Sequence, residues 1–311
     1  MNTHTRSIHR RQSSGVRVPA HVPIAERRRY IYSYSTVTRG TGRLMLMAGD
    51  QKIEHLNADF YGKGIHQDDS NPEHLFQIAH KGDVGCLATQ HGLIAAYGMD
   101  YPDVPYLVKM NAKTDIVPTA QAEPLSKALC SLDDVIRLRQ YGKLNIVGIG
   151  YTIYFGSEHE SEMLAEAGKL IAAAHALGMI AVVWAYPRGK AVQQEKDAHL
   201  IAGVAGACAS LGADFVKVNM PTEGAAALHE ASQAAGRSGV VVSGGGTLGT
   251  KEFLQHTYDT IHLGGARGSA TGRNIHQKSL TEAVAITKAL SAIVYKNASV
   301  DSAHDLYTHS L

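Results

Sequence analysis

Residues 212–221 read Gly-Ala-Asp-Phe-Val-Lys-Val-Asn-Met-Pro, a stretch that places one short strand between two helices. The segment Phe215–Asn219 is mostly apolar, as expected for a strand buried on both faces. A helical pattern over 194–211 ends at Gly212, and another over 222–235 begins after Pro221. The stretch therefore predicts one unit of a repeating strand–helix architecture.

The same alternation runs along most of the chain. Helical patterns separate the apolar segments, and the clearest cover Ser157–Leu177, with acidic residues in its first turn, and Leu280–Tyr295. Eight repeats predict a single (β/α)8 TIM barrel. A doubly wound open sheet is the alternative, but 49–52 after the first strand lack the GxGxxG pattern. The eight predicted strands are Arg43–Ala48, Val84–Ala88, Tyr106–Met110, Asn145–Ile149, Ile180–Trp184, Phe215–Asn219, Val240–Ser243 and Thr260–Leu263.

Length and charge suggest how the chain is divided. Its 311 residues fit one barrel of about 250 residues with extensions. We expect a basic N-terminal arm over 1–30, the barrel over 31–297 and a C-terminal tail over 298–311. The arm holds seven arginines and one acid, while the whole chain has a net charge of only +2, which argues against nucleic-acid binding. The arm is expected to hang free or pack on a neighbouring subunit, with an acidic partner as the alternative.

Cysteine and histidine usage bears on compartment and cofactors. The chain has only three cysteines, Cys86, Cys130 and Cys208, and they form no CxxC pair. This sparse, odd count predicts that the protein is located in a reducing cytoplasm. No run of 18 apolar residues is present, so no membrane span is expected. The 17 histidines show no HExxH pattern, so neither a catalytic metal nor another cofactor is expected. Asp50 and Glu54 as divalent-metal ligands are the minor alternative.

Lys217 is the main candidate for chemistry. Burial lowers the pKa of an amine, and a neutral amine can attack a carbonyl to form a Schiff base. The structural alternative is a strand-end lysine whose head reaches water. Tyr186, after the fifth strand, is a candidate proton shuttle, with a pKa expected to be lowered by a nearby cation. Asp50, after the first strand, is either an acid–base group for a hydroxyl or a helix cap.

Two glycine-rich loops predict a phosphate site. Residues 243–247 follow the seventh predicted strand, and residues 264–268 and 271–274 follow the eighth. Such turns expose backbone N–H groups, and a short helix opening near Gly272 would point its positive end at an anion. Arg273 can add a charge-assisted hydrogen bond. The alternative is that these glycines only form tight turns.

These motifs, taken in order, resemble those of the archaeal-type class I fructose-1,6-bisphosphate aldolases, a group that includes the DeoC/LacD-like Schiff-base aldolases. The resemblance covers about residues 40–295. The motifs that carry it are Gly49-Asp50-Gln51-Lys52-Ile53-Glu54-His55, Trp184-Ala185-Tyr186-Pro187-Arg188-Gly189, Asp214-Phe215-Val216-Lys217, Ser243-Gly244-Gly245 and Gly272-Arg273-Asn274.

The resemblance implies a metal-independent, reversible cleavage of fructose 1,6-bisphosphate to dihydroxyacetone phosphate and glyceraldehyde 3-phosphate in a homo-oligomer, often a decamer. Lys217 would form the imine, Tyr186 would donate a proton, and Asp50 would act on the substrate hydroxyl. The implied substrate-binding residues are Gln51, His55, Trp184, Ser243, Gly244, Gly245, Gly272 and Arg273.

Departures from the family pattern leave the substrate open. Residues 50–52 read Asp-Gln-Lys where Asp-His-Gly is usual, the last loop carries the extra cation Arg267, and the arm lies outside the match. One alternative is another imine-forming enzyme on a phosphorylated sugar, such as an aminodideoxyheptulosonate synthase or a phospho-sugar thiolase. A second is an inactive barrel with a binding or scaffold role. The candidates for a second phosphate are Lys109, Lys113, Arg188 and Arg267, which the sequence does not rank.

Overall fold

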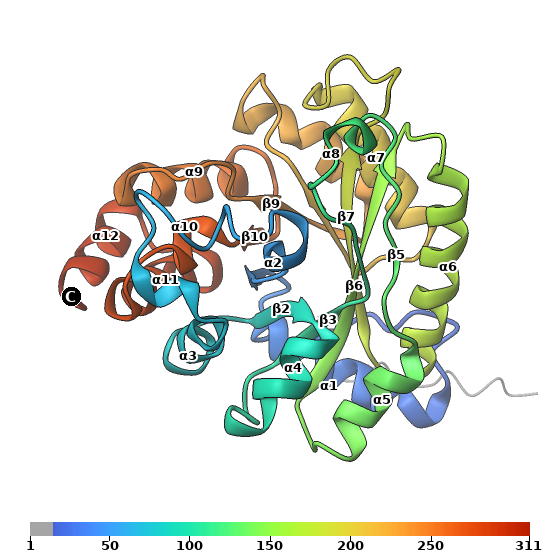
Figure 1. Ribbon diagram of the computed structural model, residues 1–311, viewed down its shortest axis with the longest axis horizontal. Helices are drawn as coiled ribbons and strands as arrows, with labels where there is room; N and C mark the ends of the chain where they lie inside the picture. Colours follow the sequence, from blue (N-terminus) through green and yellow to red (C-terminus); the bar gives the residue numbers. More distant parts are fainter. Residues whose placement is uncertain (1–14) are drawn as a thin grey trace, which may run out of the picture.

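A computed structural model describes residues 15–311 as a closed barrel of eight parallel strands surrounded by helices (Figure 1). The strand order around the barrel is β1-β10-β9-β8-β7-β6-β3-β2, which confirms the (β/α)8 prediction. A small antiparallel pair, β4 and β5, lies in the long connection after β3. The strands are β1 (Leu44–Ala48), β2 (Cys86–Gln90), β3 (Tyr106–Lys109), β4 (Asn111–Ala112), β5 (Lys127–Ala128), β6 (Ile146–Phe155), β7 (Ile180–Pro187), β8 (Phe215–Val218), β9 (Gly239–Ser243) and β10 (Gly268–Thr271).

Side-chain caps mark the start of α5, α7, α11 and α12. The Ser131 and Asp134 side chains form a capping box at α5, and Ser279 and Glu282 form one at α11. Asp197 caps α7 by accepting from the Leu200 N–H at 2.8 Å. The helices are α1 (Arg27–Thr38), α2 (Gln51–Glu54), α3 (Glu73–Lys81), α4 (His91–Tyr97), α5 (Leu132–Gln140), α6 (Glu160–Ala176), α7 (Ala198–Ser210), α8 (Leu228–Ala235), α9 (Thr250–His262), α10 (Arg273–His276), α11 (Leu280–Lys296) and α12 (Val300–Thr308).

The predicted eighth strand, Thr260–Leu263, is wrong. These residues end α9, where Thr260 and Ile261 pack inward, so a helix face produced the apolar signal. The true last strand, β10, reads Gly-Ser-Ala-Thr and lacks large apolar side chains. Small residues fit because a Cβ on Gly268 would lie 1.9 Å from the Leu44 carbonyl oxygen of β1. Consequently residues 264–267 precede the last strand and Gly268 begins it, whereas the sequence analysis placed 264–268 after it.

The fourth barrel strand is longer than predicted. The sequence indicates Asn145–Ile149, whereas β6 continues to Phe155. Gly148 and Gly150 both lie inside β6, where a neighbouring strand leaves no space for a side chain. A Cβ on Gly150, for example, would lie 2.6 Å from the Trp184 ring. The extra length carries the end of β6 to the carboxyl end of the barrel.

The N-terminal segment closes the amino end of the barrel. Val22 and Tyr30 are buried in the same apolar cluster as interior side chains such as Phe215. The Ser33 hydroxyl of α1 also donates to the Gly178 carbonyl oxygen, just before β7, at 2.9 Å. The described part of the predicted arm therefore packs on its own barrel, and the expected boundary at residue 30 falls inside α1. Residues 1–14, which hold the rest of the arm, lie outside the described residues.

Asp214 is the centre of this contact. It accepts hydrogen bonds from the Tyr30 hydroxyl, from His175 Nε2 at 2.9 Å and from the Ala181 N–H at 2.8 Å. His21 Nε2 in turn lies 2.7 Å from His175 Nδ1. A buried carboxylate that satisfies three donors at once makes the position sensitive to substitution.

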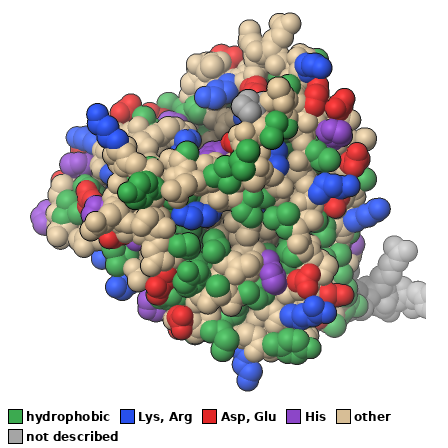
Figure 2. Space-filling model, viewed as in Figure 1, with side chains coloured by type: hydrophobic (Ala, Val, Ile, Leu, Met, Phe, Trp, Pro, Cys, Tyr) green, Lys and Arg blue, Asp and Glu red, His purple; other side chains and the backbone are tan. Residues whose placement is uncertain are grey.

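The remaining surface features concern the C-terminus and charge. The expected tail contains α12, whose Ala303 and Tyr307 are buried. Figure 2 shows acidic and basic side chains interspersed over the face in view, with no dominant patch of one sign. Within residues 15–311, every helix is too short or too polar to cross a membrane.

We expect Asp214→Ala to lower the free energy of unfolding by about 3 kcal/mol, because three buried donors lose their acceptor. Denaturant unfolding followed by circular dichroism measures the change. Asp301→Ala is the control, since Asp301 forms an exposed ion pair with Lys251, and we expect a much smaller change in the free energy of unfolding. Equal effects of the two substitutions would contradict the proposed importance of the Asp214 contacts.

Candidate active site

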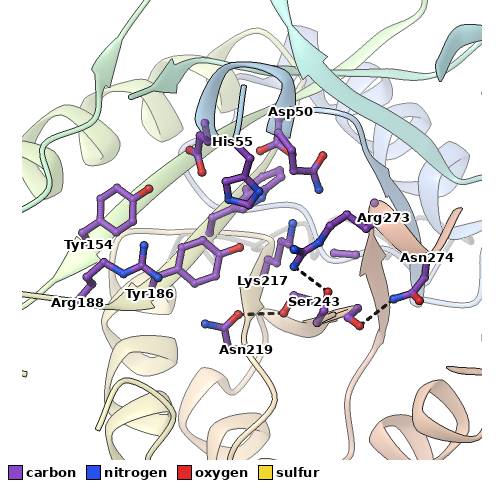
Figure 3. A pocket seen from close by; sticks show the side chains of 17 residues that line it. Asp50, His55, Tyr154, Tyr186, Arg188, Lys217, Asn219, Ser243, Arg273 and Asn274 are labelled. Atoms are coloured by element: carbon purple, nitrogen blue, oxygen red, sulfur yellow. Dashed lines mark hydrogen bonds between the residues drawn. The ribbon is translucent and has the colours of Figure 1, made fainter. Parts of the chain in front are cut away.

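A cavity of about 190 Å³ opens at the carboxyl end of the barrel, where β1, β6, β7, β8, β9 and β10 end (Figure 3). It brings together every residue predicted to be catalytic or substrate-binding and, of the four second-phosphate candidates, Arg188. Four further residues, Tyr154, Asn219, Ala270 and Asn274, line it although they were not among the predicted site residues. The complete lining is Asp50, Gln51, Glu54, His55, Tyr154, Trp184, Tyr186, Arg188, Lys217, Asn219, Ser243, Gly244, Gly245, Ala270, Gly272, Arg273 and Asn274.

Lys217 projects from β8 into this cavity (Figure 3). The residue is only 5% exposed, so its head does not extend into bulk solvent as the structural alternative requires. Its Nζ lies 5.0 Å from the centre of the Trp184 ring. Burial lowers the pKa of the Lys217 amine, and the carboxylates of Asp50 and Glu54 oppose that shift only in part. A larger fraction of Lys217 than of an exposed lysine is therefore in the neutral form at a given pH.

A second buried lysine, Lys109, lies against the same tryptophan. Its Nζ is 5.4 Å from the Trp184 ring centre and donates to the carbonyl oxygen and Oδ1 of Asn111, at 2.7 and 3.1 Å. Burial also lowers the pKa of Lys109. Because its amine is engaged by Asn111 and does not line the cavity, Lys109 is a poorer candidate for attack on a substrate.

Two carboxyl groups face the lysines from the β1 end. Asp50 is buried and stands at the N-terminus of α2, but its side chain caps none of the helix N–H groups. The helix-cap interpretation of Asp50 is therefore wrong. Asp50 Oδ1 and Glu54 Oε1 have no hydrogen-bond partner among the described residues. Burial raises the pKa of Glu54, which favours its neutral form. These unpartnered oxygens are available to a bound molecule.

Tyr186 lies at the end of β7 beside Tyr154 of β6, with ring centres 6.3 Å apart. The expected lowering of its pKa is wrong for this structure. Burial raises the pKa of Tyr186 well above its usual value, the charges of Asp50 and Glu54 act in the same direction, and Arg188 opposes them. The phenol therefore keeps its proton near neutral pH and is suited to donate it.

The loop after β9 has the form of an anion cradle. Gly245 adopts a positive φ of 65°, and its N–H and that of Gly246 donate to no acceptor in residues 15–311. Asn274 fixes the loop by donating to the carbonyl oxygens of Gly244 and Gly246, at 3.0 and 2.9 Å. Arg273 Nη2 donates to the Gly245 carbonyl oxygen at 2.9 Å. Free N–H groups beside a guanidinium suit a phosphate.

The short helix predicted near Gly272 is present as α10. Gly272 is needed there because a Cβ would lie 2.2 Å from Gln51 Nε2. His55 Nδ1 lies 2.5 Å from Asp59 Oδ2, and Asp59 Oδ1 lies 3.7 Å from Arg273 Nη1. The hydrogen bond to Asp59 raises the pKa of His55. His55 and Arg273 are thus held through one shared carboxylate.

The structure ranks the candidates for a second phosphate. Arg188 lines the cavity, and its Cζ lies 5.5 Å from the Tyr154 ring centre. Lys113 Nζ lies 5.5 Å from the same ring centre but does not line the cavity and pairs with Asp115 at 2.7 Å. Arg267 as a cation of this site is wrong, because it precedes β10 and lies at the amino end of the barrel. Arg188 is the remaining cavity-lining candidate.

The residues missed by the sequence analysis have identifiable causes. Tyr154 lies beyond the predicted end of its strand at Ile149, in the part of β6 that the sequence analysis did not include. Asn219 immediately follows β8 and accepts from the Ser243 hydroxyl at 3.0 Å. A polar residue directly after a buried strand is a usable signal for such a position. Within residues 15–311, no cluster of three or more His, Cys, Asp or Glu side chains could hold a metal ion.

Comparisons with known proteins agree with this geometry. A family model described as DeoC/LacD family aldolase matches residues 44–278. The chain is 51% identical over 302 residues to the fructose-bisphosphate aldolase/6-deoxy-5-ketofructose 1-phosphate synthase of Methanocaldococcus jannaschii, covering 96% of this chain and 97% of the relative. A solved fructose-bisphosphate aldolase from Slackia heliotrinireducens matches with a TM-score of 0.93 and 54% identity, covering 96% of this chain and 95% of that one.

A further solved relative bears on the lysine. It is an archaeal fructose-1,6-bisphosphate aldolase whose catalytic lysine is covalently bound to the carbinolamine intermediate of the substrate. It matches with a TM-score of 0.74 and 29% identity, covering 85% of this chain and 98% of that one.

We expect Lys217 to lose its proton at a lower pH than Lys251, because burial destabilises the Lys217 ammonium whereas Asp301 raises the pKa of exposed Lys251. Competitive acetylation across pH 7 to 11, read by peptide mass spectrometry, compares the two amines within one sample. A Lys217 titration at or above that of Lys251 would contradict the expectation.

Proposed function

Since the chain belongs to the DeoC/LacD family of aldolases, we propose that it reversibly cleaves fructose 1,6-bisphosphate to dihydroxyacetone phosphate and glyceraldehyde 3-phosphate through a Schiff base. The observation that carries this proposal is Lys217, a buried amine inside a cavity that has an anion cradle on one side and Arg188 on the other. The names of the relatives and the covalent lysine intermediate in one of them support it.

In the first step, the neutral amine of Lys217 attacks the C2 ketone of the open-chain sugar. The resulting carbinolamine takes up a proton from solvent, loses water and becomes a protonated imine, which can accept an electron pair; the proton returns to solvent when the imine is hydrolysed. The lowered pKa of Lys217 favours this step because the attacking form is the unprotonated amine. Arg273, whose charge acts on Lys217, stands where it can hold the phosphate on the adjacent C1.

In the second step, the bond between C3 and C4 breaks. Asp50 takes the proton from the C4 hydroxyl, glyceraldehyde 3-phosphate leaves as the aldehyde, and the bonding electron pair moves into the iminium to give an enamine. Asp50 suits this role because its Oδ1 lies in the site without a partner among residues 15–311. Arg188 would hold the C6 phosphate through a charge-assisted contact.

In the third step, Tyr186 protonates C3 of the enamine, and water hydrolyses the imine to release dihydroxyacetone phosphate and free Lys217. The raised pKa of Tyr186 keeps the phenol protonated and ready to donate. The proton gained by Asp50 balances the proton lost by Tyr186, so the site returns to its starting state after exchange with solvent.

A second candidate reaction uses the same imine on a sugar with one phosphate. The relative from M. jannaschii also carries the name 6-deoxy-5-ketofructose 1-phosphate synthase. A product with a single phosphate at C1 would need the cradle and Arg273 but not Arg188. The two reactions therefore make different demands on the two ends of one cavity.

The assembly and compartment are also proposals. A cytoplasmic location is supported by Cys86, Cys130 and Cys208, which are all free thiols. A homo-oligomer is expected from the resemblance to archaeal-type class I aldolases, and light scattering of the purified chain measures its mass.

We expect borohydride reduction in the presence of dihydroxyacetone phosphate to fix a stable adduct on Lys217. Lys217→Met should lose the adduct and at least ~10³ in kcat, because the imine cannot form. Lys109→Met is the matched control, which removes the other buried lysine, and its protein should still form the adduct on Lys217. An adduct on Lys109, or none, would refute the assignment.

We expect Arg188→Gln to raise KM for fructose 1,6-bisphosphate about 10- to 100-fold, because one charge-assisted contact to the substrate is lost. Fructose 1-phosphate lacks the second phosphate, so Arg188 has no charged group to hold. For this sugar KM should change less than about threefold. Steady-state kinetics on both sugars measures the two ratios. Equal losses on both sugars would show that Arg188 does not bind the second phosphate.

A further inference from the structure

A second, larger cavity of about 610 Å³ lies at the amino end of the barrel. Its walls come from residues 15–42 and from the residues just before β8, β9 and β10. None of its lining residues lines the cavity around Lys217. Its volume is within the range of about 300 to 1,000 Å³ that small-molecule sites occupy.

Three arginines line this cavity, Arg17, Arg237 and Arg267. None of them forms an ion pair with a carboxylate of residues 15–311. Residues 1–14 contain no Asp or Glu, so that part of the chain has no side-chain carboxylate to offer. The positive charge of the three side chains is therefore not neutralised by acidic side chains of the chain itself.

The single carboxylate in the cavity wall does not change this balance. Asp214 is already the acceptor for Tyr30, His175 and the Ala181 N–H. The three arginines remain as charged donors for a ligand. Arg267 Nη1 lies 3.4 Å from the Arg237 carbonyl oxygen, which places the two arginines together, and the charge of Arg267 acts on the Tyr34 phenol in the same wall.

We propose that this cavity binds a small phosphorylated anion that carries at least two negative charges. Three arginines that line one cavity supply enough positive charge to balance such an anion, and guanidinium matches phosphate with paired hydrogen bonds. The ligand bridges Arg17 of the N-terminal segment to Arg237 and Arg267 of the barrel. A single concave cavity fits a small molecule better than a nucleic-acid backbone, which needs an extended basic surface.

Inorganic pyrophosphate serves as the probe in isothermal titration calorimetry at low ionic strength. The wild-type chain is expected to bind two pyrophosphates, one at the anion cradle and one at this second cavity. Arg237→Ala/Arg267→Ala should lose one site or weaken it at least 10-fold, while Arg273→Ala should lose the other. Because the two cavities share no residue, Arg237→Ala/Arg267→Ala should keep wild-type aldol cleavage.

The control is Arg28→Ala/Arg137→Ala, which removes the same charge from exposed arginines that line neither cavity, and it should keep both sites. Binding that survives unchanged in Arg237→Ala/Arg267→Ala overturns the proposal. The proposal is also overturned if the wild-type chain binds only one pyrophosphate and Arg273→Ala loses that site. This outcome includes the case in which a neighbouring subunit covers the second cavity. Neither outcome affects the imine assignment, which the borohydride adduct tests separately.

Discussion

The burial of Lys217 is the constraint on which the rest of the site depends. An amine removed from water favours its neutral form, but that burial costs free energy unless nearby groups compensate. Here the compensation comes from Asp50 and Glu54 at the end of β1, while Lys109 on β3 adds a second positive charge. Groups that are far apart in the sequence must therefore meet around the Trp184 ring, and the closed barrel brings the ends of those strands together.

This arrangement extends into the supporting polar network. Asn111, which accepts from Lys109, donates to the carbonyl oxygens of Ser126 and Thr152 at 3.0 and 2.8 Å and accepts from the Thr152 N–H at 2.7 Å. One amide thus ties the long connection after β3 to β6 while it fixes the second lysine. Because Lys109 is immobilised in this way, its charge acts on Lys217 from a fixed place.

Much of the site was predictable because it follows a rule of position. Residues at the carboxyl ends of buried strands face the site, so Lys217, Tyr186 and Asp50 followed from strand patterns and from family resemblance. The errors arose where apolar pattern and structure diverge. The apolar face of α9 was taken for a strand, and the predicted strand 145–149 ended one residue before Gly150, which β6 needs because the Trp184 ring leaves no space for a side chain there. The direction of the Tyr186 pKa could not be read from sequence, because it depends on how deeply the phenol is buried.

The seam between β1 and β10 has a consequence for how the chain reaches its native state. Leu44 pairs with Gly268, so the first strand to be synthesised waits for the last before the barrel can close. Such long-range pairing is slow, and until it forms β1 presents an unpaired edge that other chains can join. The other strand of this pair, β10, reads Gly-Ser-Ala-Thr and is only weakly apolar. It is therefore less prone to join other chains before the barrel closes.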